Sequence, residues 1–257
     1  MCLVLLARAA HPQYAIVLAA NRDEYHVRPA ARAAWWNEGW LAGRDLEAGG
    51  TWLGITRAGR WGVITNVREP GQHDPNAPSR GALVVRYLAH PGNSEAAMRE
   101  VVLSGERHNG FNLLGGEPGG AHWGSNRGPA ARALDPGIYG LSNELLDTPW
   151  PKVLRIKAAF AQWCREERSD AAATADLFSM LYDRTEAPDA ELPSTGIGLE
   201  RERLVSAAFI VSPTYGTRCS TVLTIRHDGA VHFVERTFDP EGEATGDVEF
   251  RFMLDAV

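Results

Sequence analysis

A chain of 257 residues with 44% hydrophobic and 23% charged residues has the composition of a soluble globular protein and can bury a substantial core. Its net charge of −6 provides no basic surface of the kind that nucleic acids bind, so we expect no nucleic-acid partner. No apolar run reaches the roughly 18–20 residues that span a bilayer, so we expect no stable membrane insertion.

The N-terminus and the cysteines indicate a reducing compartment. The opening stretch MCLVLLA lacks a positively charged start and is interrupted by Arg8, which is not typical of a signal peptide. Cys2, Cys164 and Cys219 are too few, and odd in number, for a disulfide framework. We therefore expect a cytoplasmic protein. Its oligomeric state does not follow from the sequence.

The first part of the chain predicts strands. The apolar runs 2–7 and 14–20 predict two buried strands joined by a short turn. Runs at 52–57 and 61–66 predict a second pair of strands, linked as a hairpin.

The hydrophobic period then becomes helical. Residues 80–90 and 94–104 carry apolar side chains at helical spacing on either side of a Pro-Gly pair, and a second helical block spans about 152–182. Between and after these blocks the chain returns to strand patterns, at 110–116, 119–125, 137–143, 205–212, 218–226, 230–238 and 247–254.

Three groups of strands separated by helix pairs differ from the alternating units of a parallel, doubly wound sheet. The pattern predicts an α+β fold, a four-layer α-β-β-α sandwich with two antiparallel sheets, each covered by a helix pair. We expect a single domain over residues 1–257. The segment 184–200 lacks periodicity and is rich in turn-forming residues, so both a lid and a plain solvated loop fit it.

Cys2 is the candidate nucleophile. Removal of Met1, which is usual before a small residue, would put a thiol and a free α-amine on one residue. An α-amine with a reference pKa of about 7.7–8.0 can accept the proton of a thiol whose reference pKa is about 8.5. The thiol is then activated without a histidine. In the alternative interpretation, Cys2 is a small buried hydrophobic residue.

The quartet Asn21-Arg22-Asp23-Glu24 directly follows the second predicted strand. If the first two strands are antiparallel neighbours, the quartet lies beside Cys2. Arg22 can then hold a thiolate or a substrate carboxylate, and Asp23 can orient the α-ammonium. Asn21 and Glu24 flank this pair as candidates for substrate binding. An internal salt bridge between Arg22 and Asp23 is the alternative.

Further polar residues lie at the ends of predicted strands. Asn66 and Asn143 can donate side-chain hydrogen bonds to a developing oxyanion, or they can cap the turns that follow. Arg218 starts a later strand as a second candidate cation, or as an exposed arginine at a strand edge.

No metal-ligand spacing, Walker motif, dinucleotide fingerprint or covalent-haem motif is present, so we predict no metal site and no cofactor requirement for hydrolysis. The chain has eight tryptophans, five of which cluster within 27 residues of sequence. They can wall a pocket for a flat or acyl ligand, or they can pack in the core. The cluster comprises Trp35, Trp36, Trp40, Trp52 and Trp61.

Long stretches of the sequence resemble the NRDE family, also called the transport and Golgi organisation protein 2 family. The resemblance runs from residue 2 to about 225, in the motifs MCLVLLA, ANRDEYHVRPA, AGRDLEAGGTWLGIT, GVITNVRE, FNLLGG, LSNELLDTPWPKV and YGTRCSTVL.

The resemblance implies the fold of the N-terminal nucleophile hydrolases, with Cys2 in the nucleophile position. By position, the site residues of similar cysteine amidases correspond to Arg22, Asp23, Asn66, Asn143 and Arg218. The adjacent Arg-Asp pair differs from the wider spacing in those amidases.

Two hypotheses follow. In the first, Cys2 attacks an amide or thioester and forms an acyl-enzyme that water hydrolyses. In the second, which the family link to intracellular haem trafficking implies, the protein binds haem as cargo without chemistry. The partner is a small molecule in both cases: an amide, an acyl compound or haem.

Overall fold

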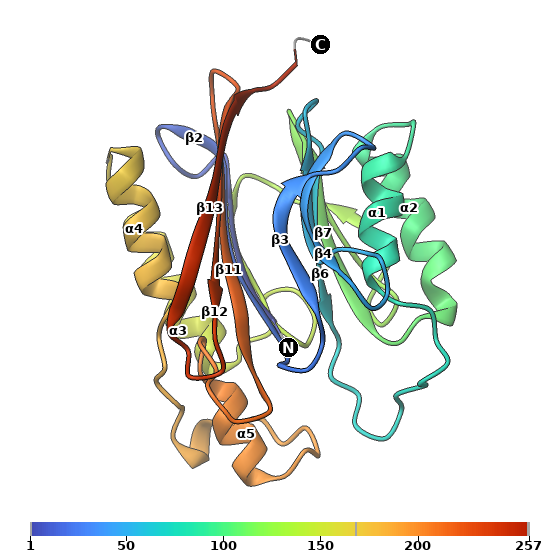
Figure 1. Cartoon of the computed structure of the whole chain (residues 1–257), viewed down its shortest axis with the longest axis vertical. Coiled ribbons are helices and arrows are strands. Elements are labelled where there is room, and N and C mark those ends of the chain that lie inside the picture. Colours follow the sequence, from blue (N-terminus) through green and yellow to red (C-terminus); the bar gives the residue numbers. More distant parts are fainter. Residues whose placement is uncertain (1, 168, 256–257) are drawn as a thin grey trace. The chain divides into compact units, whose positions relative to one another are not determined.

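The computed structural model describes residues 2–167 and 169–255, and within it the chain divides into two compact units, each built on one sheet (Figure 1). Unit 1 contains the segment up to Val27, Pro136–Ser142 and Leu146–Phe252. Unit 2 contains Arg28–Asp135, Asn143–Leu145 and the segment from Met253.

Unit 1 contains a six-stranded sheet in the order β10-β1-β2-β11-β12-β13. The pairs β10–β1, β1–β2, β2–β11 and β11–β12 are antiparallel. The strands are β1 (Cys2–Arg8), β2 (Tyr14–Tyr25), β10 (Gly137–Leu141), β11 (Tyr215–Arg226), β12 (Ala230–Phe238) and β13 (Ala244–Met253).

Helices α3 (Pro151–Trp163) and α4 (Asp170–Leu181) cover one face of this sheet (Figure 1). Alternate strand residues, such as Leu3 and Leu5 of β1, pack with the helices in one core cluster. Because side chains alternate between the faces of a strand, Cys2 and Val4 belong to the opposite face. Helix α5 (Leu199–Ser206) and the short 3-10 helix η2 (Asp189–Glu191) complete the unit.

Unit 2 contains a seven-stranded sheet in the order of the sequence, from β3 to β9. Its strands are β3 (Ala30–Trp35), β4 (Trp40–Asp45), β5 (Leu53–Thr56), β6 (Trp61–Asn66), β7 (Phe111–Glu117), β8 (Gly120–Ser125) and β9 (Arg132–Ala133). Helices α1 (Gly81–Ala89) and α2 (Ser94–Ser104), followed by the 3-10 helix η1 (Gly105–Arg107), cover one face. The Tyr87 ring lies directly on β7 at Gly115, where a Cβ atom would be 2.5 Å from it.

Local sequence explains where the helices begin. The side chains of Asn93 and Ser169 accept hydrogen bonds from the first turns of α2 and α4, as N-caps do. Pro151 occupies the first position of α3, where its missing N–H costs nothing. No helix formed by the described residues is long and apolar enough to cross a bilayer.

The predicted fold class is confirmed: the protein is α+β, with antiparallel sheets that each carry a helix pair. The predicted helix pairs correspond to α1 with α2 and α3 with α4. The predicted hairpin of 52–57 and 61–66 corresponds to β5 and β6.

Three details of the prediction are wrong. The quartet does not follow the second strand but belongs to it, because β2 continues to Tyr25 in register with β11. Residues 205–212 do not form a strand: α5 ends at Ser206, and the apolar run after it is irregular chain with buried side chains. The strands β3 and β4 were not predicted, because the alanines of β3 carry little β-propensity.

The segment 184–200 is bonded to α5 at several points. Ser206 accepts a hydrogen bond from the backbone N–H of Ala187, and Glu202 accepts one from the backbone N–H of Thr195. Arg203 forms an ion pair with Asp189 at 2.6 Å. These contacts attach the segment to unit 1 along its length.

Candidate functional site

Cys2, Arg22 and Cys219 form a row across three neighbouring strands. Cys2 pairs with Arg22 between β1 and β2, and Cys219 pairs with Arg22 between β2 and β11. Directly paired residues project to the same face of a sheet, so the three side chains share the face opposite to α3 and α4. The predicted proximity of Cys2 and the quartet is therefore confirmed.

The half-buried Cys2 thiol is subject to opposing influences. Burial raises its pKa, and the charge of Asp23 raises it further. A hydrogen bond from the Asp23 backbone and the charge of Arg22 lower the pKa, but the balance leaves it raised. Cys2 is therefore a protonated thiol at neutral pH and needs a base to become a nucleophile. Met1, whose removal would create the α-amine, lies outside the described residues.

Asp23 is a carboxylate held deep in unit 1, with 3% of its surface exposed. Its Oδ1 atom accepts a 2.7 Å hydrogen bond from the Thr217 hydroxyl, and its backbone carbonyl accepts one from the Tyr215 hydroxyl at 3.1 Å. Burial raises the pKa of Asp23, whereas Lys152, Thr217 and Arg22 lower it, and the balance is a raised pKa.

Arg218 lies at a bulge in β11, not at the start of the strand. The register with β2 shifts between Thr217 and Cys219, which leaves Arg218 as the extra residue. Its guanidinium donates to the carbonyls of Tyr25 and His26, at 3.0 and 3.2 Å. Burial and the nearby charge of Arg22 lower the pKa of Arg218.

The other members of the quartet differ in role. Asn21 donates to the carbonyls of Leu181 and Ala208, both at 2.8 Å, and accepts a hydrogen bond from Ser220 at 2.6 Å. These bonds hold β2 against the segments that end α4 and follow α5. Glu24 remains partly exposed, with Oε2 at 3.9 Å from Arg22.

The two candidate oxyanion donors meet in unit 2. The Asn143 side chain donates to the Asn66 carbonyl at 3.0 Å, and the Asn143 carbonyl accepts from the Arg68 backbone at 2.8 Å. Asn143 thereby links its short segment to the end of β6. The other predicted catalytic residues, by contrast, lie in unit 1: Cys2, Arg22, Asp23 and Arg218.

The candidate tryptophans Trp52 and Trp61 also lie in unit 2. Trp61 is 1% exposed within β6, as expected of a core residue. Trp52 is half-buried, and its ring occupies the space beside Gly43, where a Cβ atom would be 2.3 Å from it.

Sequence reasoning missed Thr217, Tyr215 and Lys152. Thr217 and Tyr215 bind Asp23 directly, and Lys152 is a buried cation whose charge acts on Asp23. A signal for Lys152 was present, since the chain contains only two lysines, Lys152 and Lys157, among 26 basic residues. Within residues 2–167 and 169–255, no group of three His, Cys, Asp or Glu side chains is placed to hold a metal ion.

Two solved structures resemble this chain at low sequence identity. An N-acylethanolamine-hydrolyzing acid amidase ortholog from Caenorhabditis elegans aligns with a TM-score of 0.46 and 11% identity, over 86% of this chain and 92% of its own. A mutant conjugated bile acid hydrolase from Clostridium perfringens aligns with a TM-score of 0.41 and 9% identity, over 97% of this chain and 92% of its own.

Comparison of sequences identifies relatives at higher identity. The bovine Transport and Golgi organization protein 2 homolog is 36% identical over 98% of this chain and 99% of its own length. The human and mouse homologs are 35% and 34% identical, each over 92% of this chain and 93% of their own length. The family model described as Transport and Golgi organisation 2 matches residues 1–240. The chain therefore belongs to the Transport and Golgi organisation 2 family.

Proposed function

We propose that this protein is a cysteine hydrolase that cleaves an amide or thioester bond through an acyl-Cys2 intermediate. One observation carries the proposal: Cys2 is paired in register with Arg22, next to the buried carboxylate Asp23. The other two cysteines are less suited to be the nucleophile. Both are buried, whereas Cys2 is half-buried and so within reach of a substrate.

The reaction needs only groups on this chain and a water molecule. The Cys2 sulfur attacks the carbonyl carbon while the thiol proton passes to the α-amine that Met1 removal would expose. The C–N or C–S bond of the substrate then breaks, and the proton leaves with the amine or thiol product. Water cleaves the acyl-Cys2 thioester, which releases the acid and restores the thiol.

The surrounding residues have distinct roles in this proposal. Asp23 holds the α-ammonium, while Arg22 and Arg218 bind a negative charge of the substrate close to the sulfur. Glu24, at 3.9 Å from Arg22, partly neutralises the positive charge of Arg22. Asn21 holds β2 in place through its hydrogen bond to the Leu181 carbonyl. Trp52 and Trp61 stay predictions as substrate contacts. Single substitutions can test each of these assignments.

The oxyanion donors predicted from the sequence, Asn66 and Asn143, remain part of the proposal. Loss of one such donor lowers a hydrolytic rate by about 10²–10³-fold. Asn143→Ala also removes the hydrogen bond to the Asn66 carbonyl, so its stability must be measured beside its rate.

The decisive experiment is covalent labelling of the processed protein. The natively expressed protein is first weighed intact to establish whether Met1 is absent, and is then treated with p-nitrophenyl acetate. We expect one acetyl group per chain, absent in Cys2→Ala and retained in Cys164→Ala as the matched control. Equal labelling of Cys2→Ala would contradict the proposal.

The alternative, haem as cargo, is favoured by a single feature of the site: Cys2 is the half-buried cysteine, whereas Cys164 and Cys219 are buried. A thiolate ligand to haem iron would then come from Cys2. Titration with ferric haem should give a saturable Soret shift that Cys2→Ser alters. A titration without a Soret shift would exclude this function.

We also propose the cytoplasm as the working location. The three cysteines of the chain are free, and a Cys2 nucleophile must stay reduced to react.

A further inference from the structure

Lys152 is a buried lysine in the first turn of α3, with 1% of its surface exposed. Its ammonium group donates a 2.9 Å hydrogen bond to the carbonyl of Val205. Burying a charge costs several kcal/mol unless an opposite charge accompanies it, so an opposite charge near Lys152 would stabilise the buried ammonium.

The position on α3 does not account for it either. Lys152 directly follows Pro151 at the N-terminus of the helix, where the macrodipole is positive. A cation at this end is unfavourable, and the first turn of α3 contains no acidic residue. A stabilising opposite charge would therefore come from another element of the fold.

The segment 205–210, which contains the last two residues of α5 and the chain after them, brings an opposite charge close. Lys152 binds the segment at Val205, and Asn21 binds it at Ala208 through a 2.8 Å hydrogen bond. The Thr217 hydroxyl accepts a 2.9 Å hydrogen bond from Ile210 and donates one to Asp23. Lys152 thus binds this segment directly and Asp23 binds it through Thr217, and both residues have less than 4% of their surface exposed.

We propose that Lys152 is a positioning residue of the Cys2 site, whose buried ammonium keeps the Asp23 carboxylate ionised. In support, Lys152 lowers the pKa of Asp23 more than Thr217 or Arg22 does. Other ionisable groups that act on Asp23 or respond to its charge include Arg22, Cys2 and Tyr215. The catalytic consequence rests on the function proposed above, but the charge pairing does not.

A double-mutant cycle tests the pairing without any substrate. Lys152→Met leaves the Asp23 carboxylate buried without its cation, whereas in the Asp23→Asn background there is no charge to compensate. In urea unfolding at pH 7, Lys152→Met should raise the unfolding equilibrium constant, and we expect this fold-increase to be at least about tenfold smaller in the Asp23→Asn background. Additive losses would overturn the proposal.

Two further variants separate charge from hydrogen bonding. Lys152→Gln keeps a donor for the Val205 carbonyl but has no charge, so it should be destabilised like Lys152→Met. Restored stability in Lys152→Gln would assign Lys152 a purely structural role and would overturn the proposal. Lys157→Met, on the same helix but paired with Asp147 at the surface, is the control and should be additive with Asp23→Asn.

The catalytic consequence is read from the rate at which p-nitrophenyl acetate acetylates Cys2 between pH 5 and 9. In Lys152→Met the pKa of Asp23 rises, so the acidic limb of the profile should move upward by about 1–3 pH units. Lys157→Met should leave the profile unchanged. If the double-mutant cycle shows coupling but the pH profile of acetylation does not change in Lys152→Met, the positioning role is overturned. Absence of acetylation in the unsubstituted protein would contradict the proposed hydrolase, while the cycle would still decide the pairing.

Discussion

At the scale of single residues, Thr217 joins two parts of the site through one hydroxyl group. It donates to the Asp23 carboxylate at 2.7 Å and accepts from the Ile210 backbone at 2.9 Å. Both partners are buried, so neither can turn to water if the hydroxyl is lost. The threonine therefore sets the position of Asp23 and of the chain that follows α5.

Thr217→Val keeps the volume of the side chain but removes the hydroxyl. Two buried polar groups then lose a partner, and we expect the free energy of unfolding to fall by about 2–4 kcal/mol. Urea denaturation followed by circular dichroism measures the loss. Thr221→Val, at an equally buried position of β11, is the control, and an equal loss in both variants would contradict this role for Thr217.

At the scale of secondary-structure elements, β11 is shaped by a close approach of two backbones. Gly216 lies where a Cβ atom would be 2.7 Å from the carbonyl oxygen of Ile210. Only two residues later, the bulge at Arg218 changes the register with β2. The strand thus follows the segment 205–210 closely and then turns its next side chains toward the row with Cys2.

Gly216→Ala should disturb this approach. The added methyl group meets a backbone atom that cannot rotate away, so we expect a destabilisation of about 1–3 kcal/mol. Acetylation of Cys2 should slow in parallel, because β11 carries Thr217 and Arg218. Thermal unfolding and intact-mass kinetics measure the two effects, and full stability in the variant would contradict the close approach.

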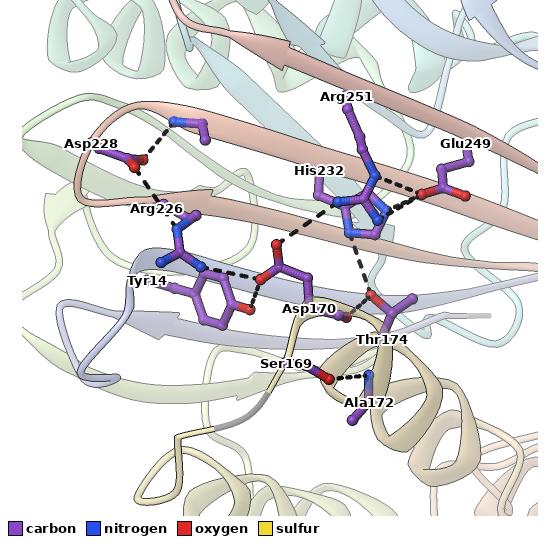
Figure 2. A network of polar contacts seen from close by, with 11 residues as sticks. Tyr14, Ser169, Asp170, Ala172, Thr174, Arg226, Asp228, His232, Glu249 and Arg251 are labelled. Carbon is purple, nitrogen blue, oxygen red and sulfur yellow. Dashed lines mark hydrogen bonds and ion pairs between the residues drawn. The ribbon is translucent and has the colours of Figure 1, made fainter.

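Helix α4 is attached to the sheet through its first residue, Asp170. Figure 2 shows this carboxylate between Tyr14, Arg226 and Arg251. The Tyr14 hydroxyl donates to it at 2.6 Å, and the two arginines lie at 3.2 and 3.8 Å. The hydrogen bond from Tyr14, followed by the charges of Arg226 and Arg251, lowers the pKa of Asp170.

This pKa predicts how acid affects the protein. A carboxylate whose pKa is lower in the folded state stabilises the protein above its unfolded pKa of about 3.9, and the contribution is lost as the pH falls through the folded value. Asp170→Asn should therefore lower the melting temperature at pH 7, and the effect should become smaller as the pH falls below about 3.9. Melting curves across this range, with the exposed Asp228→Asn as control, provide the test. A difference that does not vary with pH would contradict it.

At the scale of the whole molecule, the two units are assembled differently. The core cluster of unit 2 comes entirely from residues 40–113 and their partners Trp36 and Ala131, which lie in one continuous segment. The core of unit 1 instead combines β1, β2, α3, α4 and β11, which are far apart in the chain. Unit 2 therefore has a local core and unit 1 a non-local one.

A fragment of residues 28–135 should fold by itself, because it contains β3 to β9, α1 and α2. Without Asn143, which bonds to Asn66 and Arg68, it should be less stable than the intact protein. The fragment 136–255 lacks β1 and β2, the strands between β10 and β11, and should not fold. Cooperative thermal unfolding of fragment 28–135 but not of fragment 136–255 would support this difference. If fragment 28–135 showed no cooperative unfolding, the prediction would be contradicted.

The sequence by itself determined the fold class, most helices and the pairing of Cys2 with the quartet. Hydrophobic period distinguishes helices from strands locally, and a short turn between two buried strands leaves antiparallel pairing as the simplest arrangement. The motif resemblance also identified the family. These features depend on neighbours in the chain, so one sequence is enough to show them.

Tertiary structure alone decided which groups surround Asp23. Thr217, Lys152 and the segment 205–210 come from elements more than a hundred residues away from it, and no local period places them there. The bulge at Arg218 and the extension of β2 through the quartet also depend on pairing with β11. These contacts depend on burial and long-range pairing. A charged side chain needs a partner only when the folded chain removes it from water, and the tertiary structure decides which partner lies near it.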